Sequence, residues 1–169
     1  MTARALRSTA QRIQVLQAEA NDLEKEILTL VRQTAPKLLG LLGVGPITAA
    51  QVLVSWSHQG RFRSETAFAS FAGVSSIPAS SGLTNRHRLN RSGDRQLNRA
   101  MHTITLIRMR LDPATKSYVA RRISEGKTSR DAQRCLKRAI SRQLFKILEG
   151  IEPNDDGQPH NLPKRLDSI

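Results

Sequence analysis

Serines and arginines gather in a polar segment in the middle of the chain, where their side chains could act on a phosphodiester. A glycine, Gly82, directly follows the last of the serines. A serine hydroxyl can attack phosphorus when guanidinium groups neutralise the phosphoryl oxygens and a glycine lets the backbone approach closely. The residues that could take part are Ser75, Ser76, Ser80, Ser81, Arg86, Arg88, Arg91, Arg95 and Arg99.

Residue chemistry alone leaves two functions open for this segment. In the first, one serine is a nucleophile that breaks a phosphodiester bond. In the second, which the residue types by themselves favour, the serines and arginines form a solvated loop that only grips phosphate.

The turn Gly43-Val44-Gly45, followed by Pro46 and an apolar run, is a second candidate phosphate contact. The pattern resembles a helix-hairpin-helix motif. At the start of the second helix of such a motif, backbone N–H groups have no partner within the helix and the helix dipole is positive. We therefore predict that Gly43 and Gly45 let the backbone approach a DNA phosphate. A tight turn with only a structural role is the alternative.

The positive charge of the chain is confined to one region. The formal net charge is +13, and residues 84–147 contain 17 Lys and Arg against 4 Asp and Glu, so this region carries the whole excess. A nucleic acid is the natural partner of such a segment. A membrane fits less well, because no apolar run is long enough to span one and no aromatic face accompanies the charge. Further phosphate contacts are expected from Arg134, Lys137 and Arg138.

The composition gives no sign of a metal site or a disulfide. The four histidines are scattered, and Cys135 is the only cysteine, so no pair has the spacing of zinc ligands. Cys135 falls in an apolar stripe and is expected to be a small buried side chain. There is no signal peptide, so we expect a cytoplasmic protein.

These residues must be positioned by helices. Aromatic residues make up only 4% of the chain, so Leu, Ile, Val and Ala have to form the core, which favours an all-α fold. Apolar spacing, Pro and Gly predict short helices after Pro36, from Pro46 and within 112–127, and helices at 64–72, 95–111 and 129–149. Residues 73–94 are predicted to be a polar loop. In the last helix the positions off the apolar stripe are Arg130, Arg134, Lys137, Arg138, Ser141 and Arg142.

Residues 1–35 have the pattern of a coiled-coil arm. The seam consists of Leu6, Thr9, Ile13, Leu16, Ala20, Leu23, Ile27 and Leu30, with threonine as its single polar member. So narrow a seam favours pairing between copies, and hence a homo-oligomer, over a helix folded back on its own domain. Residues 36–149 would then form the DNA-binding domain. Residues 150–169 lack periodicity and predict a disordered tail.

Five short motifs within residues 38–149 together resemble the C-terminal domain of a family of insertion-sequence transposases. Members of that family have an N-terminal RuvC-like nuclease domain with four acidic residues, and they include bridge-RNA-guided recombinases. The motifs are Gly43-Val44-Gly45-Pro46, Arg61-Phe62-Arg63-Ser64, Phe71-Ala72-Gly73, Ser81-Gly82 and Arg91-Ser92-Gly93-Asp94. One departure is Asp94, since Asn is more usual after this glycine.

The resemblance implies that a serine in the Ser-Gly loop attacks DNA, together with Mg²⁺ held by the nuclease domain. The corresponding residue is Ser81, with Ser80 as the alternative in register, and Arg91 would contact phosphate. The resemblance also implies a coiled coil before this half of the protein. We expect the nuclease domain to be absent from this chain, which would therefore bind DNA without cutting it and need no cofactor of its own.

Two other functions are compatible with the sequence. The chain could be a non-enzymatic helix-hairpin-helix DNA-binding protein, in which the serine loop is only a phosphate clamp. It could also be an RNA-binding scaffold, for example for a guide RNA. The scarcity of aromatic residues disfavours stacking on single strands as the main mode of binding.

Overall fold

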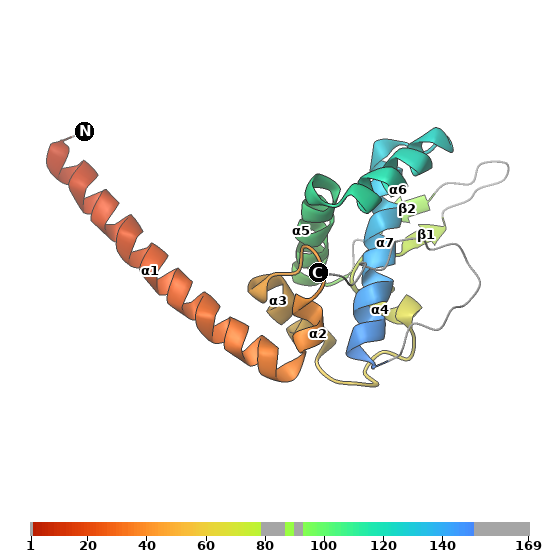
Figure 1. Cartoon of the computed structure of the whole chain (residues 1–169), viewed down its shortest axis with the longest axis horizontal. Helices are drawn as coiled ribbons and strands as arrows, with labels where there is room; N and C mark the ends of the chain where they lie inside the picture. The colour runs from red at the N-terminus through yellow and green to blue at the C-terminus, as the bar shows by residue number, and fades with distance from the viewer. Residues whose placement is uncertain (1, 79–86, 90–92, 151–169) are drawn as a thin grey trace, which may run out of the picture.

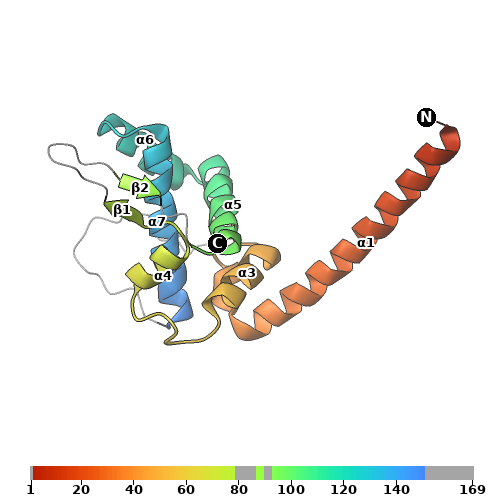
Figure 2. The same cartoon turned by 180° about the vertical axis from the view of Figure 1, so that it is seen from behind.

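A long helical arm is attached to a helical domain. The computed structural model describes residues 2–78, 87–89 and 93–150. The first helix, α1 (Ala3–Thr34), extends away from the other elements, which pack together at its C-terminal end (Figure 1). The view from behind shows the same separation (Figure 2).

The domain is built from helices and one pair of short strands. The helices are α2 (Pro36–Leu39), α3 (Pro46–Trp56), α4 (Glu65–Phe71), α5 (Arg95–Leu111), α6 (Pro113–Ser124) and α7 (Ser129–Leu148). The strands are β1 (Ser76–Pro78) and β2 (His87–Leu89), which pair antiparallel. The predicted helical fold is confirmed, and α4, α5 and α7 begin and end within one residue of their predicted bounds.

The two strands correct the prediction of a continuous loop over residues 73–94. They form a ribbon in which Ser76 pairs with Leu89, Ile77 with Arg88 and Pro78 with His87. Three residues are too few to show the alternation of apolar and polar side chains by which a strand is recognised in a sequence.

Local chemistry explains where the helices begin. The side chains of Ser64, Asp94, Asp112 and Thr128 each accept a hydrogen bond from a backbone amide in the first turn of α4, α5, α6 and α7. These amides have no partner within their own helix, so each cap stabilises its helix by about 1 kcal/mol. Helices α2 and α3 have a proline in the first turn, and α6 has both a proline and the Asp112 cap.

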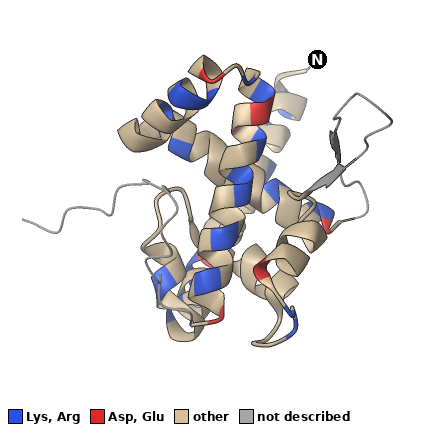
Figure 3. Ribbon diagram, turned by 90° about the vertical axis from the view of Figure 1, so that its right-hand side faces the viewer, with Lys and Arg blue, Asp and Glu red and all other residues tan. Residues whose placement is uncertain are grey.

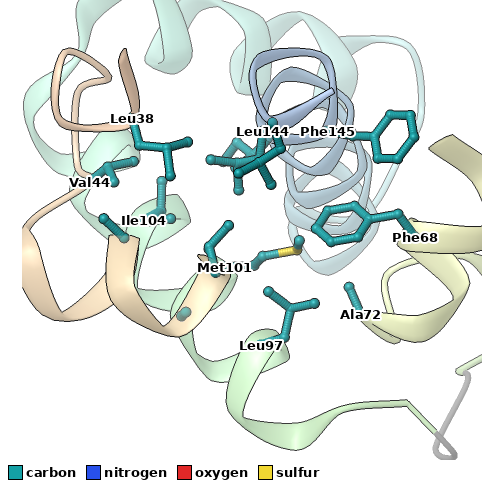
Figure 4. Packing of buried hydrophobic residues seen from close by; sticks show 14 of the residues in the cluster. Leu38, Val44, Phe68, Ala72, Leu97, Met101, Ile104, Leu144 and Phe145 are labelled. Carbon is teal, nitrogen blue, oxygen red and sulfur yellow. The ribbon is translucent and has the colours of Figure 1, made fainter. Parts of the chain in front are cut away.

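The hydrophobic core lies between α5, α7 and the helices that cover them (Figure 4). Leu97, Met101 and Ile104 of α5 are fully buried, as are Leu144 of α7 and Phe68 of α4. Burying one such side chain stabilises the fold by roughly 1.5–3 kcal/mol. Val31, in the last turns of α1, is also buried in this cluster, so the end of the arm is fixed to the domain.

Two side chains of α7 are not placed as the sequence predicts. Ser141, predicted to lie off the apolar stripe, is fully buried, and its hydroxyl has no hydrogen-bond partner within the described ranges. Cys135, predicted to be buried, is only partly so. The reason is that α2, α4, α5 and α6 all pack against α7, so its buried sector is wider than one stripe and is centred differently.

Candidate nucleic-acid interface

The strands β1 and β2 flank the segment that carries the Ser-Gly motif. Ser80, Ser81 and Arg86 lie in the connection between the strands, which is outside the described residues, as is Arg91. For Arg88 only the backbone, in β2, is described.

The two ends of the ribbon segment meet at one place, which we call the ribbon base (Phe71–Gly73 with Gly93 and Asp94). The backbone amide of Asp94 donates to the carbonyl oxygen of Phe71 over 2.7 Å. A Cβ atom added to Gly93 would lie 2.5 Å from that same oxygen and 2.7 Å from the backbone nitrogen of Gly73. Only glycine allows two backbones to approach so closely. The glycine of the Arg-Ser-Gly-Asp motif therefore closes the base.

Asn98 adds a second bond across the ribbon base. Its side-chain amide donates to the carbonyl oxygen of Ala72 over 2.8 Å, so the end of α4 is tied to the first turn of α5. The ribbon thus leaves the domain and returns to it between two joined helix ends.

Asp94 joins α5 to α3 through its carboxylate. One oxygen accepts from the backbone amides of Gln96 and Leu97, at 2.8 and 3.0 Å, and so caps α5. The other accepts from the hydroxyl of Ser55 in α3, at 2.7 Å. Burial opposes ionisation, but the hydrogen bonds from Leu97, Ser55 and Gln96 outweigh it and lower the pKa of Asp94.

Ser55 is itself held in place from two directions. It is 4% exposed, its hydroxyl accepts from the side-chain amide of Gln51 at 3.1 Å, and its carbonyl oxygen accepts from the guanidinium of Arg61 at 2.9 Å. The same guanidinium lies 5.2 Å from the ring centroids of Phe62 and Phe71. The Arg-Phe-Arg-Ser motif thus has a structural role next to the ribbon base. Ser55 was not predicted as part of the site, because a serine within an apolar helix carries no signal of a partner 39 residues away.

The pKa of Asp94 predicts a pH-dependent effect of Asp94→Asn. Asparagine keeps one acceptor oxygen for the cap but loses the charge, which should lower the free energy of unfolding by about 1 kcal/mol at pH 7. Because the pKa of the folded state lies below the usual 3.8, the carboxylate stabilises the fold above that value, and this contribution is lost as pH falls through the folded-state pKa. Urea unfolding at pH 7 and pH 3 measures both values. A difference between the proteins that is the same at the two pH values would contradict the prediction.

The Gly-Val-Gly turn is fixed to α5 from inside the domain. Gly43 has a φ of +83°, and a Cβ atom there would lie 3.1 Å from the carbonyl oxygen of Ile104. The side chain of Arg108, which is 5% exposed, donates to the carbonyl oxygen of Leu42 at 2.8 Å and to the amide oxygen of Gln143 at 2.9 Å. Burial lowers the pKa of Arg108. Internal packing is therefore sufficient to explain the glycine at position 43.

Gly45 occupies a different environment from Gly43. It is exposed, and a Cβ atom there would meet nothing within 4 Å. Its amide donates to the hydroxyl of Thr48 at 3.0 Å, and Pro46 has no amide hydrogen. The remaining backbone amides in the first turn of α3, those of Ile47 and Thr48, have no acceptor within the helix.

The predicted basic contacts fall into two groups. Arg95 and Arg99 are exposed near the start of α5, one turn apart and next to the ribbon base. On α7, whose Lys and Arg residues are spread along the central helix in Figure 3, two of the predicted contacts have acidic partners. Arg134 pairs with Asp131 at 2.7 Å, and Arg138 pairs with Glu65 of α4.

Lys137 of α7 lies near His102 of α5. Burial lowers the pKa of the Lys137 ammonium group. Burial, and to a smaller extent the charge of Lys137, lowers the pKa of His102. Lys137 therefore lies at the contact between α5 and α7.

The described ranges contain neither a candidate metal centre nor a candidate membrane span. Within them, no three His, Cys, Asp or Glu side chains come together in a way that could hold a metal ion. The Mg²⁺ implied by the resemblance therefore has no ligand set in this part of the chain. None of the described helices combines the length and apolar character needed to cross a bilayer.

Comparison with known proteins gives two similar insertion-element proteins. The chain is 33% identical over 144 residues to the insertion element IS110 uncharacterized 43.6 kDa protein of Streptomyces coelicolor, a match that covers 83% of this chain and 36% of the relative. It is 29% identical over 143 residues to the insertion element IS900 uncharacterized 42 kDa protein of Mycobacterium paratuberculosis, covering 82% and 36%. The chain thus spans about a third of the length of these relatives.

The family match falls on the elements that build the ribbon base and the Gly-Val-Gly turn. Residues 35–120, which run from α2 into α6, match the transposase IS116/IS110/IS902 family. They include both sides of the ribbon base, Ser55 and the ribbon itself. More than half of the chain is covered, and the chain therefore belongs to the IS116/IS110/IS902 family of transposases.

Proposed function

We propose that this chain is the DNA-binding C-terminal part of an insertion-sequence transposase and that Ser81 is its nucleophile for DNA cleavage and strand exchange. The observation that carries the proposal is the ribbon base. Gly93 and the Asp94–Phe71 hydrogen bond join both ends of the segment that contains Ser81 to the helical domain. A fixed base reduces the conformational freedom of a nucleophile that must meet phosphorus in line.

The exposed arginines at the start of α5 support binding of DNA beside the ribbon base. Arg95 and Arg99 lie within the first two turns of that helix, where guanidinium groups can hold the phosphates that flank a reacting one. The amides of Ile47 and Thr48 at the start of α3 are suited to a further phosphate. Such contacts position DNA without reading its sequence.

The proposed reaction at Ser81 is a displacement at phosphorus. The hydroxyl oxygen forms a bond to phosphorus, a deoxyribose oxygen leaves, and the hydroxyl proton ends on that leaving oxygen. Family resemblance assigns Mg²⁺ to the nuclease domain, where it would stabilise the charge that develops on the phosphoryl oxygens. The described residues of this chain offer no ligand set for it, so we propose that the chain alone binds DNA but does not cut it.

The DNA-binding half of the proposal is tested by a salt series. Binding to duplexes of unrelated sequence should be similar in strength and should weaken steeply with salt, by about 0.9 in the log–log slope for each phosphate contact. The double change Arg95→Ala and Arg99→Ala should therefore reduce the slope by about 1.8.

The matched control removes the same charge from the arm, by Arg4→Ala and Arg7→Ala, both of which are exposed. Its slope should stay close to that of the unchanged protein. Equal losses in the two double variants would place the DNA away from α5. Competition by a structured RNA at lower concentration than duplex DNA would favour a guide RNA as the partner of this surface.

A further inference from the structure

The apolar seam of α1 is uncovered over most of its length. Five of its residues are at least half exposed: Leu6 at 58%, Ile13 at 61%, Leu16 at 50%, Leu23 at 52% and Leu30 at 61%. Only the C-terminal end contacts the domain, where Ile27 is partly buried against the core. A row of large apolar side chains at heptad spacing is the surface that a second helix of the same kind covers.

The charges of α1 are divided between its two halves. Residues 3–18 contain Arg4, Arg7 and Arg12 and no acidic residue. Residues 19–30 contain Glu19, Asp22, Glu24 and Glu26 against Lys25, and this lysine is paired with Asp22 at 2.8 Å. Each arm thus has a basic half far from the domain and an acidic stretch, residues 19–30, closer to it, followed by Arg32 in the last turn.

We propose that two copies of this chain pair through α1 in an antiparallel orientation. In that orientation, the basic half of each arm lies along the acidic half of the other. A parallel pair would place the basic half of one arm along the basic half of the other, and the acidic halves likewise, which is unfavourable. The proposal concerns assembly and does not depend on the chemistry of Ser81.

The heptad positions fix the register. All eight seam positions are used when Leu6 faces Leu30 of the second copy, Ile13 faces Leu23, Leu16 faces Ala20 and Thr9 faces Ile27. Thr9, the single polar residue of the seam, then faces Ile27 of the other copy. Ile27 is already partly buried against the domain of the chain to which it belongs. No other antiparallel register uses every seam position.

The positions that flank the seam also favour this orientation. In the antiparallel register, Arg12 of each copy lies beside Glu26 of the other, which gives two attractive pairs. The Glu19 residues of the two copies face each other at the centre, which gives one repulsive pair. In a parallel pair, Glu19 of each copy would lie beside Glu24 of the other, which gives two repulsive pairs, and Arg12 would face only Gln17.

The antiparallel arrangement separates the two domains. A helix of 32 residues is about 48 Å long at 1.5 Å per residue. Because each domain is attached at the C-terminal end of its arm, the two ribbon bases would lie at opposite ends of the coiled coil, and a parallel pair would bring them together.

Cysteine cross-linking of the full chain distinguishes the two orientations. In a background that carries Cys135→Ser, the variants Ile13→Cys and Leu23→Cys are made separately. An antiparallel pair predicts that each variant alone stays largely uncross-linked under mild oxidation, and that mixing the two gives a disulfide-linked dimer. Efficient cross-linking of each variant with itself would overturn the proposal in favour of a parallel pair.

A charge exchange tests the same point without cysteines. Arg12→Glu should raise the dimer dissociation constant several-fold, as measured by analytical ultracentrifugation, because it turns two attractive pairs into repulsive ones. The double change Arg12→Glu with Glu26→Arg should return it to within about twofold of the unchanged protein. Failure of the double change to restore pairing, or a protein that stays monomeric at high concentration, would refute the proposal.

Discussion

Ser81→Ala is expected to abolish DNA strand exchange and any covalent protein–DNA adduct in an enzyme completed with its nuclease domain. A methyl group cannot form the bond to phosphorus, so the loss should be complete within detection. DNA binding should be nearly unchanged, because one neutral hydroxyl contributes little beside the arginines that hold phosphate. Gel assays of strand exchange and of adduct formation, together with a binding curve for the same protein, measure both outcomes.

The control for register is Ser80→Ala, which should be the milder change. Peptide mapping of the adduct by mass spectrometry identifies the serine directly. An adduct on Ser75, Ser76 or Ser80 would refute the assignment of Ser81, whereas full strand exchange by Ser81→Ala would favour a loop that only grips phosphate.

Gly93→Ala is expected to have a much larger effect on the fold than the same change at Gly45. The new Cβ atom would lie 2.5 Å from the carbonyl oxygen of Phe71 and 2.7 Å from the nitrogen of Gly73, so the ribbon base would have to open. The loss in the free energy of unfolding should be about 1–3 kcal/mol. In the completed enzyme, strand exchange should fall further than DNA binding, because the ribbon would no longer be held in position.

The matched control is Gly45→Ala, where a Cβ atom meets no atom within 4 Å. Its stability should remain within about 0.5 kcal/mol of the unchanged protein. Thermal unfolding of the three proteins measures the difference. A Gly93→Ala protein as stable as Gly45→Ala would mean that the ribbon base is not closely packed.

The sequence determined the helices and their bounds. Caps such as Asp94 and Thr128, prolines such as Pro46, and apolar spacing act over a few residues, so they can be recognised without knowing the fold. The seam of α1 was evident for the same reason, although pairing between arms stays a prediction. The confinement of charge to residues 84–147 also needed only the sequence.

The candidate serines and arginines were selected by residue type and by resemblance. The contacts that close the ribbon base next to them were not predicted. The contact of Gly93 with Gly73 joins residues 20 positions apart, and Ser55 meets Asp94 over 39. Nothing in the local pattern at either end specifies such a partner.

Only the tertiary structure decided which polar side chains are available to a ligand. Arg138 was predicted as a phosphate contact because it lies off the apolar stripe, but the packing of α4 against α7 pairs it with Glu65. Ser141 was predicted off the stripe and is buried, because helices cover α7 on several sides. A single helix shows the direction of each side chain, whereas burial and pairing depend on the neighbours that the whole fold brings to it.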